Sequence, residues 1–537
     1  MSRERLYLFD TTLRDGAQTA GVDFTLEDKI EVARMLDALG IDHVEGGYPG
    51  ANPTDTAFFA EDRGLRASVT AFGMTKRVGR SASNDPGLQD VLAARADAFC
   101  FVAKTWDFHV RVALGCTLEE NLEAIRDTVR AAKSRGEVLI DCEHFFDGYK
   151  ANPDYALTCA RAAHEEGARW VVLCDTNGGT LPHEVSAIVA EVARHVPGSH
   201  LGIHPHNDTE NAVANALAAV EAGARQIQGT LNGLGERCGN ANLVSLIPTL
   251  KLKPAYAARF EIGVTEAGLA ELTHASRMLD EMLNRQPNRH APYVGANAFA
   301  HKGGIHASAV AKDPTTYEHV APEAVGNARK LLVSDQAGRS NVLAELARVG
   351  IEVAKDDPRI GRLLDEVKTR EAEGWAYEGA EASFELLARR MLGTVPTYYE
   401  VESFRVMVER RHNAVGRLVS VSEAVVKVSV DGETLMSVAE GNGPVNALDL
   451  ALRKDLGRYQ PYIADLRLTD FKVRILDGGT GAVTRVVIES TDGQGAVWNT
   501  VGVSANVIDA SFQALTDSIT YRLLRAGAPA GRPLTSS

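Results

Sequence analysis

Eight short apolar runs constrain the fold more than any other feature of this chain of 537 residues. They recur roughly every 30 residues, a repeat length typical of strand–helix units. In order they are LYLFDTT, HVEGGYP, ASVTAFG, AFCFVAK, VLIDCEH, WVVLCDT, HLGIHPH and QIQGTLN. Amphipathic stretches separate them, and TLEDKIEVARMLDALG predicts a helix that ends at Gly40. Eight alternating strand and helix signals predict a closed (β/α)8 barrel, the TIM barrel of the α/β class.

Polar residues stand at the carboxyl ends of most of these runs, the end at which such a barrel carries its active site. They are Arg14 and Asp15, Glu45, Lys104, Asp141 and Glu143, Asp175 and Thr176, His204 and His206, and then Asn232, Glu236, Arg237 and Asn240. Helix capping alone explains one or two charged strand ends. So many of them predict a polar pocket at one mouth of the barrel.

The run HLGIHPH indicates a metal site within that pocket. His204 and His206 are alternate residues of a strand, so their imidazoles point to the same side. Asp15, after the first run, adds the carboxylate oxygen that a divalent ion accepts beside two nitrogens. Either segment alone also fits a structural role, as a buried histidine or a helix cap. Two such strand ends in one barrel favour a metal ion.

The rest of the chain predicts two further segments. The barrel is expected over residues 1–260. Residues 261–395 are helical and charge-rich and predict a connector, interrupted by the glycine-containing loop GANAFAHKGGIHASAV. Over residues 396–537, the alternation in VESFRVMV, AVVKVSV, FKVRIL and TRVVIES predicts a separate α+β domain.

This last domain contains a weak duplication. Residues 438–452 resemble residues 501–515, and each segment follows a strand and opens a helix. Any strand–helix junction favours Gly, Asn and Ala, but a shared register over the whole segment favours an internal pseudo-repeat.

Composition excludes several classes of function. The net charge of −14 disfavours nucleic acid and anionic membrane surfaces, and no apolar run reaches the ~18 residues that a membrane span needs. The start MSRERLYLF lacks a signal-peptide pattern, which predicts a cytoplasmic protein. The six cysteines show no CxxC spacing and are expected to be reduced and structural.

Three motifs carry a family resemblance. LFDTTLRDG, HPHND and NGLGERCGNANL resemble the metal-dependent Claisen-condensing barrel enzymes, the family of 2-isopropylmalate, homocitrate and citramalate synthases. The segments EGGYPGANPTD, KTWDFHV, CEHFFDGYKANPDYA, CDTNGGT and HKGGIHASAV resemble its (R)-citramalate branch. The likeness covers nearly the whole chain.

The resemblance implies a metal centre and a condensation reaction. Asp15, His204 and His206 would be the metal ligands, with the side-chain oxygen of Asn240 nearby. The ion would be Mn, Mg, Zn or Co, since all tolerate such ligands. The reaction would join acetyl-CoA to pyruvate and release (R)-citramalate and CoA, the first step of a pyruvate route to isoleucine.

The resemblance also assigns roles to residues around the metal. Arg14 would polarise the keto oxygen, and Thr176 would bind the carboxylate of the oxoacid. A thioester methyl group is a weak acid and needs a placed base. Glu143 would supply it together with His306 and Tyr317, the latter two reaching in from a neighbouring subunit of a homodimer. The last domain would bind the end product isoleucine, with its carboxylate at helix N-termini that follow AEGNGP and GVSAN.

Alternatives remain at this stage. A 2-isopropylmalate synthase differs by only a few pocket contacts, because one or two methylenes are worth about 1–3 kcal/mol. A hydroxymethylglutaryl-CoA lyase would carry a cysteine-bearing glycine loop, and a carboxyltransferase would carry an AMKM biotinyl site; neither is found in the sequence. A non-catalytic amino-acid sensor would have no need of the intact polar strand ends.

Overall fold

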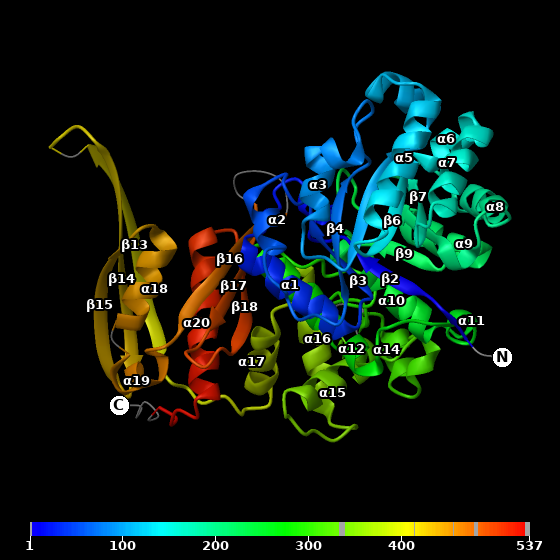
Figure 1. The fold of residues 1–537 in the computed structure, drawn as a ribbon. Coiled ribbons are helices and arrows are strands. Elements are labelled where there is room, and N and C mark those ends of the chain that lie inside the picture. Colours follow the sequence, from blue (N-terminus) through cyan, green and yellow to red (C-terminus); the bar gives the residue numbers. More distant parts are fainter. Residues whose placement is uncertain are drawn as a thin grey trace. The chain divides into compact units, whose positions relative to one another are not determined.

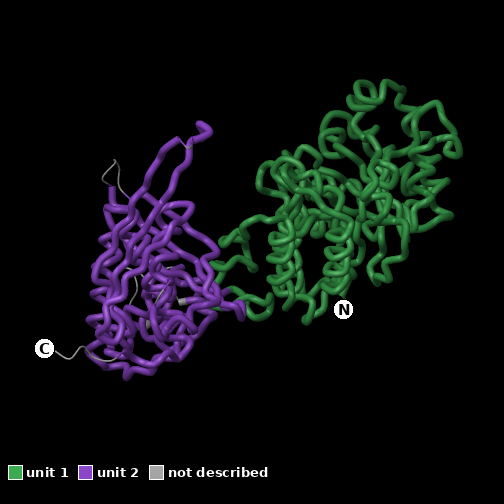
Figure 2. Tube along the Cα trace, turned by 90° about the vertical axis from the view of Figure 1, so that its left-hand side faces the viewer, with its two compact units in different colours: residues 1–299, 319–329 green, residues 300–318, 330–537 purple. Residues whose placement is uncertain are grey.

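The chain folds into two compact units, coloured separately in Figure 2. A computed structural model describes residues 3–331, 339–377, 379–412, 414–454, 456–476 and 482–531. The first unit comprises residues 1–299 and 319–329, and the second comprises residues 300–318 and 330–537. The domain boundaries predicted from sequence, after residues 260 and 395, stay predictions.

Eight parallel strands close into a barrel in the first unit, as the sequence predicts (Figure 1). Each of the eight apolar runs forms one strand. In barrel order the strands are β2 (Tyr7–Asp10), β3 (His43–Gly47), β4 (Ser68–Met74), β5 (Ala98–Lys104), β6 (Glu137–Glu143), β7 (Trp170–Asp175), β8 (Leu201–Pro205) and β9 (Gln226–Gly229). The barrel closes where Tyr7 of β2 pairs with Gln226 of β9.

Helices follow the strands along the chain. They are α1 (Leu26–Leu39), α2 (Pro53–Phe58), α3 (Pro86–Leu92), α4 (Asp107–His109), α5 (Leu118–Ala132), α6 (Phe145–Ala151), α7 (Pro153–Glu165), α8 (Pro182–Val192), α9 (Ala212–Ala222) and α10 (Leu243–Leu252). Helix α1 begins at a capping box formed by Thr25 and Asp28, and it ends at Gly40 as predicted. Gly40 has φ of 95°, and a Cβ there would lie 2.6 Å from the carbonyl oxygen of Gly263, so only glycine fits.

The inside of the barrel is apolar toward the amino ends of its strands and polar toward their carboxyl ends. Phe9, Leu139 and Trp170 belong to a cluster of buried residues distinct from the larger core that the strands share with the helices. Asp141 lies two residues after Leu139 on the same strand and is also buried. Since alternate strand residues share a face, buried polar groups stack on the apolar cluster toward the carboxyl ends.

A buried lysine braces the loops at that end. Lys29 of α1 donates from Nζ to the carbonyl oxygens of Leu13 and Gly46, at 2.9 Å each, and pairs with the carboxylate of Asp55. A buried ammonium group is tolerated only when its donors are satisfied. Because Leu13 directly precedes Arg14, these contacts fix the loop that carries Arg14.

The first unit is completed by short elements that precede or follow the barrel strands along the chain. These are β1 (Glu4–Arg5), which pairs with β10 (Phe260–Glu261), and α11 (Pro254–Ala257), α12 (Glu266–Ala270) and α13 (Leu272–Met282).

The second unit begins with short strands and helices. They are β11 (Ala300–His301), α14 (Gly304–Val310), β12 (Lys330–Leu331), α15 (Arg339–Arg348), α16 (Pro358–Ala372) and α17 (Glu381–Met391). The interpretation of GANAFAHKGGIHASAV as a loop throughout is wrong, because its second half forms α14. Glycines stop before Ile305, and the alanines that follow favour a helix.

Two similar halves make up the rest of the second unit. The first contains β13 (Glu400–His412), β14 (Leu418–Val430), β15 (Glu433–Gly441) and α18 (Pro444–Lys454); the second, after α19 (Gln460–Ile463), contains β16 (Arg467–Ile475), β17 (Thr484–Thr491), β18 (Val497–Ser504) and α20 (Val507–Arg525). Each half is an antiparallel three-stranded sheet followed by a helix. The predicted pseudo-repeat is therefore confirmed.

Two cores hold the second unit together. One joins both halves, and in it the rings of Phe404 and Phe512 lie 4.4 Å apart between centroids. The other joins helices α15 to α17 with Val501 of β18.

In the part of the chain that the structure describes, no helix is long and apolar enough to span a membrane. All six cysteines are free, and Cys238 differs from the expected structural thiols in being exposed.

Candidate metal centre and active site

Asp15, His204 and His206 converge at the mouth of the barrel. Nε2 of His204 lies 3.3 Å from Oδ2 of Asp15 and 3.3 Å from Nε2 of His206, and the distance from His206 Nε2 to Asp15 Oδ2 is 3.9 Å. All three side chains are buried. One carboxylate and two imidazoles so close together form a donor set suited to a divalent cation.

Unpaired buried acceptors beside these atoms fit a cation. Within the described residues, Asp15 Oδ1 and Asn240 Oδ1 have no hydrogen-bond partner. The amide nitrogen of Asn240 donates to the carbonyl of Leu234 at 3.1 Å, and this contact leaves the amide oxygen as the open acceptor. Leaving a buried acceptor unpaired costs free energy, and a bound cation would remove that cost.

The electrostatics of the site act differently on its ligand groups, and the pKa of His204 is raised because its contact with Asp15 outweighs the effect of burial. Burial alone would raise the pKa of Asp15, but the charge of Arg14 and the contact with His204 outweigh it and hold that pKa well below its usual range. Burial and the nearby His204 lower the pKa of His206 to about 4. At neutral pH, Asp15 is therefore a carboxylate and His206 a neutral imidazole, the forms that bind metal.

Arg14 is held in one orientation beside Asp15. Its Nε donates to Glu45 at 2.8 Å and its Nη1 donates to Asp15 at 3.1 Å. The guanidinium carbon lies 4.0 Å from the centre of the Phe72 ring, at cation–π distance. A cavity next to Arg14 is lined by Phe72 and Tyr48, among others. This cavity gives a small ligand access to the guanidinium group.

Glu143 and Thr176 lie at the ends of neighbouring strands, β6 and β7. The carboxylate of Glu143 forms an ion pair with Lys104 at the end of β5. The hydroxyl oxygen of Thr176 accepts a hydrogen bond from the backbone N–H of His144 at 2.8 Å. The carbonyl oxygen of Thr176 accepts from Arg237 at 2.7 Å, so both its backbone and its side chain are fixed.

His306 and Tyr317 belong to the second unit. His306 is exposed in the first turn of α14, and its ring stacks on that of Tyr317 with centroids 4.0 Å apart. Tyr317 is 45% exposed. Their contribution to the barrel of a partner subunit stays a prediction.

Some residues at the strand ends have structural partners instead. Asn232 donates to the carbonyl of Ser276 in α13 at 2.8 Å and accepts from the hydroxyl of Ser276 at 2.6 Å. Asp175 accepts from the backbone and the hydroxyl of Thr180. These contacts stabilise loops.

The sequence reasoning missed Gln228, whose amide oxygen lies 2.7 Å from Nδ1 of His204. The signal was present in the run QIQG, where two glutamines alternate along an otherwise buried strand.

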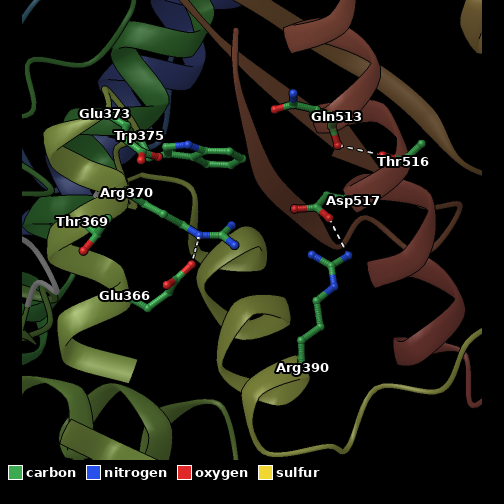
Figure 3. Close-up of a pocket in the computed structure, with 9 residues that line it drawn as sticks. All are labelled: Glu366, Thr369, Arg370, Glu373, Trp375, Arg390, Gln513, Thr516 and Asp517. Atoms are coloured by element: carbon green, nitrogen blue, oxygen red, sulfur yellow. Dashed lines mark hydrogen bonds and ion pairs between the residues drawn. The ribbon is translucent and has the colours of Figure 1, made fainter. Parts of the chain in front are cut away.

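The second unit contains a polar cavity of its own, between α16, α17 and α20. Figure 3 shows two ion pairs among its lining residues, Arg370 with Glu366 at 2.6 Å and Arg390 with Asp517 at 2.7 Å. It contains none of the residues predicted for catalysis.

Family models match three successive parts of the chain. An HMGL-like model matches residues 5–278, a homocitrate synthase post-HMGL domain-like model matches residues 293–374, and a LeuA allosteric (dimerisation) domain model matches residues 378–523. The first covers the barrel, and the last covers both halves of the pseudo-repeat.

The chain is similar to named enzymes over nearly its full length. It is 49% identical over 528 residues to the (R)-citramalate synthase of Aquifex aeolicus, a match that covers 97% of this chain and 98% of the relative. The chain belongs to the (R)-citramalate synthase family. Another member, from Geobacter sulfurreducens, is 50% identical over 522 residues, or 96% of this chain and 97% of the relative. A probable 2-isopropylmalate synthase of Methanopyrus kandleri is 34% identical over 530 residues, or 97% and 99%.

The geometry generates a prediction about metal binding. His204→Ala and Asp15→Ala should each weaken Mn²⁺ binding by more than about 100-fold, since loss of a direct ligand should exceed the ~10–100-fold cost of losing an outer partner. Titration calorimetry on metal-stripped protein measures the affinity. His195→Ala, which changes a partly exposed histidine outside the site, is the control. A His204→Ala protein that binds Mn²⁺ as tightly as the unmodified chain would rule out this centre.

Proposed function

We propose that this protein condenses acetyl-CoA with pyruvate and water to give (R)-citramalate and CoA. The observation that carries the proposal is the 49% identity over 97% of the chain to an enzyme named (R)-citramalate synthase. The cluster of Asp15, His204 and His206, with Arg14 beside it, supplies the groups that such a reaction needs. This intact cluster also argues against a non-catalytic sensor.

The chemistry requires one new carbon–carbon bond and one hydrolysis. The acetyl methyl carbon gives up a proton and bonds to the keto carbon of pyruvate, whose oxygen becomes an alkoxide and then takes up a proton. Water cleaves the thioester, giving the carboxylate of citramalate and free CoA thiol. A divalent ion held by Asp15, His204 and His206, with Asn240 nearby, would act as a Lewis acid toward the oxoacid. That ion would be Mn, Mg, Zn or Co, since all four tolerate these ligands.

Arg14 and Thr176 are assigned to the oxoacid. Two guanidinium nitrogens of Arg14 are engaged by Glu45 and Asp15, and we assign its Nη2 to the keto oxygen, where negative charge develops. The hydroxyl oxygen of Thr176 accepts from a backbone N–H, so its own hydrogen can be donated to the pyruvate carboxylate. Both groups are fixed by their other contacts and need little reorganisation.

Glu143 is assigned as the base that takes the methyl proton. It is partly exposed at the mouth, with 24% of its side chain accessible, and Lys104 fixes its carboxylate. His306 and Tyr317 are assigned to the same proton transfer in the barrel of a partner subunit, which makes a homodimer the catalytic form. The stacked rings of these two residues form a preassembled pair.

Substrate preference separates this function from the closest alternative. Pyruvate should give a higher kcat/KM than 2-oxobutyrate or 2-oxoisovalerate, and one or two extra methylenes should cost roughly 10–200-fold. The release of CoA thiol, measured with acetyl-CoA and each oxoacid, gives the comparison. If 2-oxoisovalerate is the best acceptor, the protein is a 2-isopropylmalate synthase.

Removing the base should leave binding intact. Glu143→Gln should lower kcat by about 10²–10⁴-fold, because general base catalysis contributes that much, while metal and pyruvate affinities change little. Titration calorimetry with Mn²⁺ and then pyruvate, beside steady-state kinetics, separates the two effects. Asp154→Asn, a change at a carboxylate of α7 outside the site, is the control. Equal losses of affinity and turnover would contradict the assignment.

We further propose that the pseudo-repeat binds isoleucine as a feedback effector. The match of a LeuA allosteric (dimerisation) domain model to residues 378–523 supports a regulatory role. The predicted carboxylate site at the N-terminus of α20 has a competitor, since the side chain of Asn506 already accepts from the backbone of Ile508 at 2.9 Å. A ligand carboxylate would have to compete with that cap for this N–H group.

Isoleucine should inhibit in a way that simple competition with pyruvate does not explain. A ligand bound outside the barrel changes turnover only through different affinities for two states of the protein, so inhibition should be partial or cooperative. Initial rates over a grid of isoleucine and pyruvate concentrations test this, with alanine as the control amino acid. The regulatory assignment fails if calorimetry detects no isoleucine binding and the rates stay constant.

A further inference from the structure

A buried chain of hydrogen bonds leads away from the metal centre across the inside of the barrel. Oε1 of Gln228 lies 2.7 Å from Nδ1 of His204, and Nε2 of Gln228 donates to Oδ1 of Asp141 at 3.0 Å. Gln228 is on β9 and Asp141 is on β6, and these strands are not neighbours in the barrel. The contact therefore crosses the lumen and adjoins the ligand His204.

The chemistry of the three groups fixes the direction of each hydrogen bond. A glutamine amide has an oxygen that only accepts and a nitrogen that only donates. The amide nitrogen of Gln228 faces Oδ1 of Asp141, which accepts from it, and the amide oxygen faces Nδ1 of His204. Nδ1 of His204 consequently carries the proton.

When the ring is neutral, this proton position leaves the lone pair on Nε2 of His204, the atom that a cation would take. Nε2 is the atom that lies 3.3 Å from the Asp15 carboxylate and from His206. We propose that Gln228 and Asp141 are positioning residues that hold His204 in its Nδ1-protonated form, with Nε2 directed at the divalent cation. The inference rests on the metal centre assigned above. Outer partners of this kind orient the imidazole ligand and increase its basicity.

A second glutamine on the same strand separates this role from a merely structural one. Gln226 is also fully buried, two residues before Gln228 and on the same face of β9. Neither polar atom of its amide has a hydrogen-bond partner among the described residues. The barrel thus buries one glutamine without a partner and the other in contact with a ligand histidine. Gln226→Leu is therefore a matched control for a loss of buried polarity.

The test measures Mn²⁺ affinity on the metal-stripped full chain, from the EPR signal of free Mn²⁺ during titration. Gln228→Leu should weaken binding by about 10–100-fold, the usual cost of losing an outer partner. Gln226→Leu should bind as the unmodified protein does. Asp141→Leu should also weaken binding, by a smaller factor, because the amide of Gln228 can then turn around. Thermal unfolding of each variant identifies any that do not fold.

A double substitution provides rescue. In Gln228→Glu with Asp141→Asn, the new amide nitrogen at position 141 donates to the new carboxylate, which still accepts from Nδ1 of His204, so Mn²⁺ affinity should return to within about threefold of the original. Gln228→Glu alone places two carboxylates in contact, so the Mn²⁺ affinity of this single variant should stay below that of the double variant. This variant pair reports the direction of the hydrogen bonds even if Gln228→Leu fails to fold.

The possible results have distinct meanings. If the unmodified protein binds Mn²⁺ tightly and Gln228→Leu binds it equally well, this inference alone is overturned. If the double variant folds but does not recover Mn²⁺ affinity, the assigned direction of the hydrogen bonds is overturned. An unmodified protein that binds no Mn²⁺ would overturn the metal centre and this inference with it, whereas activity with another oxoacid would affect only the proposed substrate.

Discussion

Closure of the barrel between β2 and β9 is the constraint on which the rest of the catalytic unit depends. Asp15 follows β2, the first strand of the barrel; His204 lies on β8, and Asn240 follows β9, the last strand of the barrel. Only a closed sheet brings the ends of the first and last strands beside each other. The parallel direction of all eight strands then gathers their carboxyl ends at one rim, so ligands distant in sequence share one site.

The contents of the barrel complement this closure. Phe9 and Trp170 belong to the apolar cluster of the lower interior, and Asp141 and Gln228 lie among the buried polar groups above it. Apolar packing below the site excludes water, so charges above it interact more strongly than they would in solvent. Lys29 adds a rigid support from outside, because it fixes the loop that leads to Arg14. The site is thus built on packed strands and a braced loop.

Much of this architecture could be predicted from sequence. The apolar runs identified every barrel strand, and the two histidines of HLGIHPH follow from strand alternation alone. Contacts across the lumen could not be predicted, because the bond from Gln228 to Asp141 depends on which interior side chains meet from non-adjacent strands. The contact of Asn232 could not be predicted for a similar reason, since its partner, Ser276, lies on a helix beyond the barrel. The helix that carries His306 could not be predicted either, because the glycines that precede it indicate a loop.

The course of the chain between the two units has a consequence for how they can be separated. Residues 300–318 belong to the second unit, but residues 319–329 return to the first before the chain leaves it again. Three peptide crossings therefore tie the units together, where a simple two-domain protein has one linker. A single proteolytic cut at any crossing divides the chain into two fragments, and at least one of the two units then contains residues from both fragments. Each unit consists of two separate stretches of the chain, so neither can be expressed as one uninterrupted stretch of the natural sequence without losing or gaining a piece.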